Sequence, residues 1–252
     1  MIDSHCHIET IEKPEDILTE ARTRGMKAII TSSQDPEEAR RAFDLQEKCQ
    51  HFLFVCLGWH PTRLRDAPEQ LGAYTDFIRA NQHRAVGIGE VGLDYYWMKG
   101  EKQRHAAQQI FVRFVTLAKE LDLPLVIHCR EAYDDVFALL EQHGAARVMM
   151  HCFSGSKERL ALALERGYMI SLATNVCYTK KHQLLAEKTP LSQMLLETDS
   201  PWLNPFDPKK PENRPWHIAE SARVIGELHN LPPSEVLART AANARRFFGL
   251  RI

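Results

Sequence analysis

Eight short apolar runs, separated by longer amphipathic segments, recur along this chain. Each run has the length of a β-strand and lacks the polar and apolar alternation of a half-exposed sheet, so the runs indicate buried parallel strands. The first run is very short and gives the weakest signal. The runs are Met1–Ile2, Ala28–Ile30, Phe52–Leu57, Ala85–Val91, Leu125–Ile127, Val148–Met150, Tyr168–Ile170 and Met194–Leu196.

The segments between the runs carry helix signals. Several open with a proline, which is favoured in the first turn of a helix, and Gly25 follows the first segment as a stop signal. The longest segment has Ile110, Phe114, Leu117 and Leu121 on one apolar stripe. We predict helices over Pro14–Arg24, Pro36–Cys49, Pro68–Ala80, Lys102–Leu121, Glu131–His143, Trp216–His229 and Pro233–Phe248.

Strand-like runs that are each followed by a helical segment predict repeated βα units and an α/β fold. The chain has 252 residues and an ordinary globular composition. At this length the simplest closure is a (β/α)8 TIM barrel, which takes ~250 residues. We expect a single domain over residues 1–252 with an extra C-terminal helix. The alternative is an open doubly wound sheet, but no glycine-rich phosphate fingerprint follows the first run.

One segment is too rich in proline for a helix or a central strand. Pro201 to Pro215 holds five of the 13 prolines, together with Lys209, Lys210 and Arg214. We expect an ordered loop that follows the last strand and passes near the barrel mouth.

Charge and cysteine content restrict the partners and the compartment. The net charge is −1 at pH 7, so a polyanion would have to be held by local charge. The six cysteines include no CxxC pair, the first residues lack the features of a signal peptide, and no apolar run approaches the ~18 residues of a membrane span. We expect a soluble cytoplasmic protein with no membrane contact, as a monomer or weak oligomer.

Residues able to bind metal stand where the predicted strands end. His5 and His7 share one face of the first strand and could chelate one ion, although the pair alone also suits two ordinary polar residues. Four later runs lead to Glu90, His128, His151 and Asp199. Any one of these could be a buried histidine or a helix-capping carboxylate. Because the carboxyl ends of parallel barrel strands lie at one mouth, the joint pattern favours a metal site.

Six ligands exceed the needs of one catalytic ion, which keeps a position open for water. They fit two ions ~3.5–4 Å apart with a bridging carboxylate, as in enzymes that hydrolyse phosphate esters. We expect Glu90 to be the bridge, and the mixed nitrogen and oxygen donors suit Mg, Mn, Zn or Fe. The expected division of the other ligands is His5, His7 and Asp199 at one ion, and His128 and His151 at the other.

Six motifs follow one another over nearly the whole chain. They read DSHCH (3–7), LGWHP (57–61), GEVGLDY (89–95), LPLVIHCREA (123–132), HCFSG (151–155) and LETDSPW (196–202). With these motifs the chain resembles the TatD family of metal-dependent deoxyribonucleases, in the amidohydrolase-like group of TIM-barrel hydrolases. The resemblance implies a divalent-metal phosphodiesterase acting on DNA, described in the family as a 3′–5′ exonuclease. It places metal ligands at His5, His7, Glu90, His128, His151 and Asp199.

Two stretches depart from the family pattern. The family usually shows Arg-Asn-Glu-Pro after the last strand, where this chain reads Pro-Glu-Asn-Arg-Pro at 211–215. Trp59 replaces the usual small aliphatic residue before the His-Pro pair. We therefore carry over no substrate contact to residues 211–215.

The expected reaction is attack of a metal-activated water on a DNA phosphodiester at single-stranded or frayed ends. Asp199 is either the general base or a pure ligand. Glu197 is either the partner of a ligand or a charge paired inside the barrel. The candidate substrate contacts beside the strand ends are His60, Arg130, Ser154 and Asp94.

Each of these contacts has a competing role. Arg130 either clamps a phosphate or pairs with Glu131 or Asp134. His60 either donates to a phosphate oxygen or orients a ligand, and Asp94 either orients a ligand histidine or caps its loop. Aromatic residues on the loops could stack unpaired bases or simply pack those loops. They are Tyr95, Tyr96, Trp97, Phe153, Tyr178 and Trp202.

Two other functions remain open. The same metal site could hydrolyse another ester or amide, such as an aminoacyl-RNA, because this barrel supports many chemistries. A catalytically idle scaffold should lack one or more ligands, and none of the six is missing.

Overall fold

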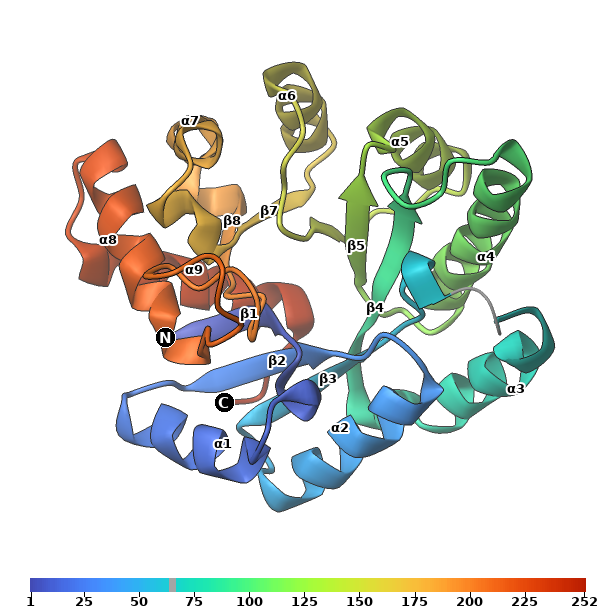
Figure 1. Cartoon of the computed structure of the whole chain (residues 1–252), viewed down its shortest axis with the longest axis horizontal. Coiled ribbons are helices and arrows are strands. Elements are labelled where there is room, and N and C mark those ends of the chain that lie inside the picture. The colour runs from blue at the N-terminus through green and yellow to red at the C-terminus, as the bar shows by residue number, and fades with distance from the viewer. Residues whose placement is uncertain (64–66) are drawn as a thin grey trace.

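Eight parallel strands form one sheet in which every strand pairs with the next one along the chain (Figure 1). The computed structural model describes residues 1–63 and 67–252. All eight predicted strands are confirmed, and β1 extends furthest beyond its predicted end, to Cys6. The strands are β1 Ile2–Cys6, β2 Ala28–Ser32, β3 Leu53–Leu57, β4 Ala85–Asp94, β5 Leu125–Arg130, β6 Val148–Met150, β7 Met169–Leu172 and β8 Met194–Leu196.

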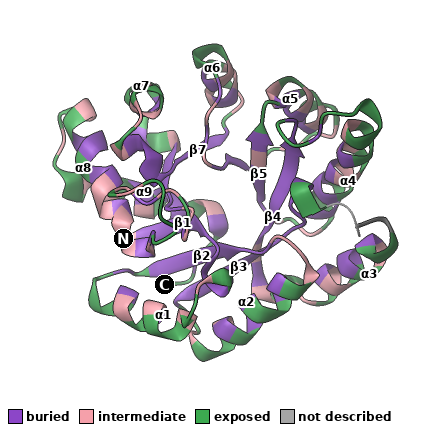
Figure 2. Cartoon of the chain, viewed as in Figure 1, coloured by how far each residue is buried: buried purple, intermediate pink, exposed green. Residues whose placement is uncertain are grey.

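Hydrogen bonds between β1 and the residues after β8 close the sheet. The backbone N–H of Asp199 donates to the carbonyl of His5 at 3.0 Å, and the N–H of His7 donates to the carbonyl of Ser200 at 2.8 Å. Helices surround the sheet, with their buried faces toward it and their exposed faces outward (Figure 2). The fold is therefore the predicted (β/α)8 TIM barrel and not an open sheet.

The helices begin where local sequence favours them. At α2, Pro36 occupies the first turn and the side chain of Asp35 accepts the N–H groups of Glu37 and Glu38, both at 2.9 Å. α6 and α7 span 9 residues each and have no counterpart among the predicted helices. The helices are α1 Pro14–Thr23, α2 Pro36–Lys48, α3 Ala67–Ala80, α4 Glu101–Glu120, α5 Tyr133–Gln142, α6 Lys157–Glu165, α7 Lys180–Lys188, α8 Ile218–His229 and α9 Pro233–Phe248.

The extra C-terminal helix, α9, contributes to the apolar floor of the barrel. Phe248 packs in one buried cluster with Ile2, Ile30 and Val126 from three different strands. Burial of such side chains stabilises the fold by about 1.5–3 kcal/mol each. The polar residues of the barrel interior therefore lie toward the opposite end of the barrel.

The loop from Pro201 to Pro215 is held against that other end. Asn213 is fully buried, and its amide donates to the carbonyls of Thr198 at 2.8 Å and Trp202 at 2.7 Å. These bonds replace the regular pairing that the prolines prevent. Within the described residues, no helix combines the length and the apolar character needed to cross a membrane.

Candidate metal centre

Strand periodicity places polar side chains directly above the apolar floor. Val126 and Met149 belong to the apolar cluster inside the barrel, and two residues later the same faces carry His128 and His151. Because side chains two apart in a strand point the same way, each apolar residue is followed by a polar one nearer the carboxyl end. The interior therefore changes from apolar to polar along the barrel axis.

Glu90 lies at the centre of the polar cluster, and its two carboxylate oxygens face different histidines. Oε1 lies 2.8 Å from Nδ1 of His128 and 3.3 Å from Nε2 of His60. Oε2 lies 3.5 Å from Nε2 of both His5 and His7 and has no hydrogen-bond partner. With one oxygen toward each pair, Glu90 has the disposition of a bridging ligand.

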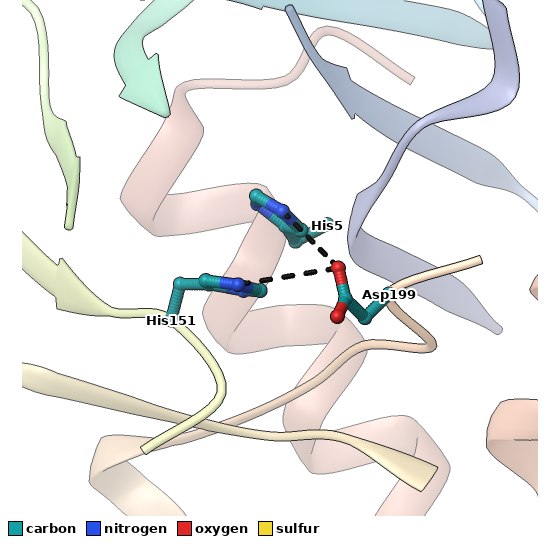
Figure 3. A group of neighbouring side chains, drawn as sticks. All are labelled: His5, His151 and Asp199. Atoms are coloured by element: carbon teal, nitrogen blue, oxygen red, sulfur yellow. Dashed lines mark ion pairs between the residues drawn. The ribbon is translucent and has the colours of Figure 1, made fainter. Parts of the chain in front are cut away.

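Asp199, His5 and His151 form a neighbouring group (Figure 3). Oδ1 of Asp199 lies 3.7 Å from Nε2 of His5 and 4.0 Å from Nε2 of His151. The rings of His5 and His151 are stacked, with centroids 3.7 Å apart. Oδ1 of Asp199 also lies 3.4 Å from Nε2 of His7, which joins this group to the one around Glu90.

The structure brings all six predicted ligands together where the barrel strands end. His151 lies beside His5 and Asp199, and its Nε2 also lies 3.6 Å from Oε1 of Glu90, the oxygen that faces His128. His60 lies beside Glu90 and His128 as well. The interior of an eight-stranded barrel is just wide enough for side chains to fill it, so His151 from the end of β6 meets His5 of β1. The expected division of these ligands between two ions stays a prediction.

The donor set fits divalent cations. Burial lowers the pKa of His7, but Asp199 and Glu90 outweigh it and raise the pKa to about 9. Glu197 and Glu90 likewise raise the pKa of His151 to about 10 against its burial. A cluster that favours positive charge this strongly, and that holds an unpaired carboxylate oxygen, suits bound metal ions.

Three of the histidines have an oxygen atom near the ring nitrogen that points away from Glu90. Nδ1 of His151 lies 2.9 Å from Glu197, and Nε2 of His128 lies 3.0 Å from Oδ2 of Asp94. Nδ1 of His7 lies 2.8 Å from the carbonyl oxygen of Ser32. Such partners set the tautomer and ring orientation of a ligand histidine. For Glu197 and Asp94 these positions agree with the partner role that was one of two alternatives from sequence, whereas no sequence motif marks a backbone carbonyl such as that of Ser32.

Two motif glycines let neighbouring strands approach Glu90. A Cβ on Gly92, whose φ is +147°, would lie 1.9 Å from the carbonyl oxygen of His128. A Cβ on Gly58 would lie 2.5 Å from backbone atoms of Glu90. Only glycine fits these positions, which bring β3 and β5 against the end of β4.

Arg130 is exposed at the mouth and forms neither of the ion pairs considered from sequence. Its guanidinium lies 3.8 Å from the ring centroid of Tyr96. Among the described residues, Glu131 and Asp134 pair instead with Lys99 and Arg159. The hydrogen-bonding edges of Arg130 are thus available to an anion.

Ser154 and the cysteines serve the surrounding structure. The N–H of Ser154 donates to the hydroxyl of Tyr133 at 3.0 Å, which holds the loop after β6. Cys6 and Cys129 are buried in the apolar cluster between strands and helices, because strand alternation turns each to the face opposite the preceding histidine. Cys152 is half-buried and receives a contact from the amide of Asn175 at 3.6 Å.

Comparison with known proteins gives one consistent answer. Residues 2–249 match the family described as TatD related DNase. The chain is 31% identical to an uncharacterized metal-dependent hydrolase of Bacillus subtilis, YabD, over 98% of each protein. It is 30% identical to the human deoxyribonuclease TATDN3, over 98% of this chain and 94% of that one.

A solved structure agrees with the sequence comparisons. The crystal structure of YjjV, a TatD homologue from Escherichia coli, superposes with a TM-score of 0.90 at 28% identity, over 99% of this chain and 98% of that one. The resemblance drawn from the six motifs is thereby confirmed. This chain belongs to the TatD family of metal-dependent hydrolases.

Proposed function

We propose that the protein is a divalent-metal-dependent deoxyribonuclease, a 3′–5′ exonuclease acting on single-stranded or frayed DNA ends. The observation that carries this proposal is the placement of Glu90, with one carboxylate oxygen toward His60 and His128 and the other toward His5 and His7. A carboxylate in this position can be shared by two divalent ions, and two-ion sites are used by nucleases to hydrolyse phosphodiesters. The human relative described as a deoxyribonuclease supports DNA as the substrate.

Two ions, Mg, Mn or Zn, would be held by His5, His7, Glu90, His128, His151 and Asp199. When bound, they would act as Lewis acids toward the phosphate and activate the attacking water. The protein's part is to hold these donors in a buried pocket and to orient them, since His60 and Asp94 lie against His128.

Asp199 is the candidate general base. Burial raises its pKa, but His7 and His151 outweigh that effect and leave the pKa below its ordinary value, so the side chain is ionised and can accept a proton. Its side chain is 16% exposed against 2% for Glu90, and so it is the carboxylate that water reaches. We propose on the ground of this exposure that Asp199 takes up the proton of the attacking water and is not a ligand alone.

We propose that Arg130 binds the substrate phosphate from the open side of the mouth and that His60 contacts the same phosphate. A guanidinium with free edges binds phosphate in a bidentate manner. Asp94 also positions His128, since its Oδ2 lies 3.0 Å from Nε2 of that ring, and Asp94 and Ser154 stay candidate substrate contacts.

The test is a time course with strands labelled at one end or the other, with and without EDTA. A 3′–5′ exonuclease releases a 3′ label at once as mononucleotide and converts a 5′-labelled strand into a descending ladder. Duplex DNA and an aminoacyl-RNA are assayed in parallel. Cleavage of the aminoacyl ester with intact DNA would refute the nuclease proposal in favour of the alternative hydrolase.

A further inference from the structure

Exposed aromatic side chains gather at the mouth that holds the candidate metal centre. Among the described residues, six large apolar side chains are exposed, and five of them lie on the loops after β4, β7 and β8. The sixth is Ile252. An exposed apolar group that is confined to one functional end of a protein indicates a ligand surface. The five residues are Tyr96, Trp97, Tyr178, Trp202 and Phe206.

The two tryptophans of this group are anchored in the same way. Each is the third residue after an aspartate of the candidate centre, and its backbone N–H bonds back to that aspartate. Trp97 donates to Oδ1 of Asp94 at 3.2 Å, and Trp202 donates to the carbonyl of Asp199 at 2.9 Å. The two residues are nevertheless 64% and 53% exposed, respectively. Their backbones are therefore fixed to the metal centre while their faces stay free.

These two tryptophans lie on opposite sides of the mouth. Trp97 follows β4 and Trp202 follows β8, and the order of strands in the barrel separates β4 and β8 by three strands in either direction (Figure 1). The candidate ligands from β1, β5 and β6 stand between them. A strand whose phosphate sits at the metals would pass one tryptophan before the cleaved bond and the other after it.

Cationic groups accompany the aromatic rings on the Trp97 side. The ring of Tyr96 packs edge-on against that of Trp97, with centroids 5.0 Å apart. The guanidinium of Arg130 lies 3.8 Å and the ammonium of Lys99 lies 5.2 Å from the centroid of Tyr96. Flat aromatic faces beside cations suit the bases and the phosphates of an unpaired strand.

We propose that Trp97 and Trp202 each stack one unpaired nucleobase, one on either side of the phosphate that is cleaved. This assignment rests on the proposed nuclease function and adds the groups that select its substrate. A base within a duplex has both faces covered by its neighbours, so two stacking sites demand unpaired bases. Selection for single-stranded or frayed ends then follows from the loops and not from the metal centre.

The test compares an oligothymidylate with a strand of equal length that carries abasic residues on both sides of the cleaved bond. The two strands have the same phosphates and differ only in the bases. Wild-type protein should show a KM about five- to 100-fold lower for the oligothymidylate per stacked base. Trp97→Ala and Trp202→Ala should each lose the part of the KM difference that comes from one stacked base. Trp97→Phe should keep most of it, because phenylalanine also stacks. Ile252→Ala is the control at an exposed residue.

A second readout does not depend on cleavage. Binding of a phosphorothioate oligothymidylate should quench the tryptophan fluorescence more than the abasic strand does. Trp59 is buried, and loss of the quenching in Trp97→Ala and Trp202→Ala separates their signal from that of the half-buried Trp216. Equal KM values for the two strands with wild-type protein would overturn the stacking assignment and leave the nuclease proposal intact. Equal losses on both strands in the alanine variants would show a structural or protein-docking role and would also overturn it. A wild-type protein that cleaves neither strand would refute the proposed function itself.

Discussion

Glu197 Oε1 lies 2.9 Å from Nδ1 of His151, inside the barrel and fully shielded from solvent. The same oxygen accepts the N–H of Cys152 at 2.8 Å, so the carboxylate is itself held in place. Nε2 of His151 is thereby directed toward Asp199 and Glu90, at 4.0 and 3.6 Å. A buried carboxylate behind a candidate ligand imidazole makes that imidazole a stronger donor.

Replacing this carboxylate should weaken metal binding without removing a ligand. We expect Glu197→Gln to lower the affinity for Mn or Zn about 10- to 100-fold, the usual effect of losing such a partner. Chelator competition measures the affinity, and circular dichroism checks the fold. Glu158→Gln, a change at the exposed start of α6, is the matched control. Unchanged affinity in Glu197→Gln would contradict the orienting role.

The base role of Asp199 predicts a loss of rate that exceeds any loss of metal. We expect Asp199→Asn to reduce kcat by at least about 100-fold while the protein stays folded, because an amide cannot accept the proton. Metal content of the purified variant, measured together with kcat, separates the base role from the ligand role. If the variant retained most of its rate, Asp199 would not be the base.

Metal removal should lower stability as well as activity. Ions that bind only the folded state at 100 times their dissociation constant stabilise it by about 2.7 kcal/mol per independent site. Wild-type protein should therefore unfold at a lower temperature in EDTA than in Mn or Zn. In Glu90→Gln, which lacks the bridging charge, the unfolding temperatures in EDTA and in Mn or Zn should differ much less. An equal difference in the two proteins would argue against Glu90 as the bridge.

Gly92 cannot be replaced without moving a strand. We expect Gly92→Ala to destabilise the protein by at least ~3 kcal/mol, because the new Cβ would overlap the carbonyl oxygen of His128 in a backbone conformation that alanine avoids. Gly72 in α3 has no atom within 4 Å of its would-be Cβ, so Gly72→Ala should stabilise by about 0.5–1 kcal/mol. Urea unfolding of both variants measures the difference, and similar effects would contradict the close approach.

His182 should make the protein sensitive to acid. Burial, helped by Lys181, lowers its pKa to about 4 in the folded state, against about 6.5 when unfolded. The unfolded chain therefore binds the additional proton first, and stability contributed by the neutral ring is lost as the pH falls from about 6.5 toward 4. Relative to His182→Gln, the wild type should lose stability over this range in denaturant titrations at pH 7.5, 6 and 5. If the free energy of unfolding of the two proteins changed equally with pH, the lowered pKa of His182 would be contradicted.

Local sequence accounts for much of the fold and for the positions of the candidate ligands. Buried parallel strands are continuous apolar runs, and the strand period of two places His128 above Val126 whatever surrounds them. Helix signals are equally local, and for this reason the predicted starts of α1, α2 and α9 agree with the structure. Short helices such as α6 carry too few residues for a periodic pattern, and they were not delimited for that reason.

The sequence by itself therefore determined the barrel, the six side chains at its mouth and the family. Only the tertiary structure decided that His151 faces His5, that His60 stands beside Glu90 and that Trp97 and Trp202 lie on opposite sides of the centre. The physical reason is that strand periodicity and helix signals act between residues near in the chain. Contacts across the barrel depend on its closure and on the paths of its loops, which no local pattern encodes.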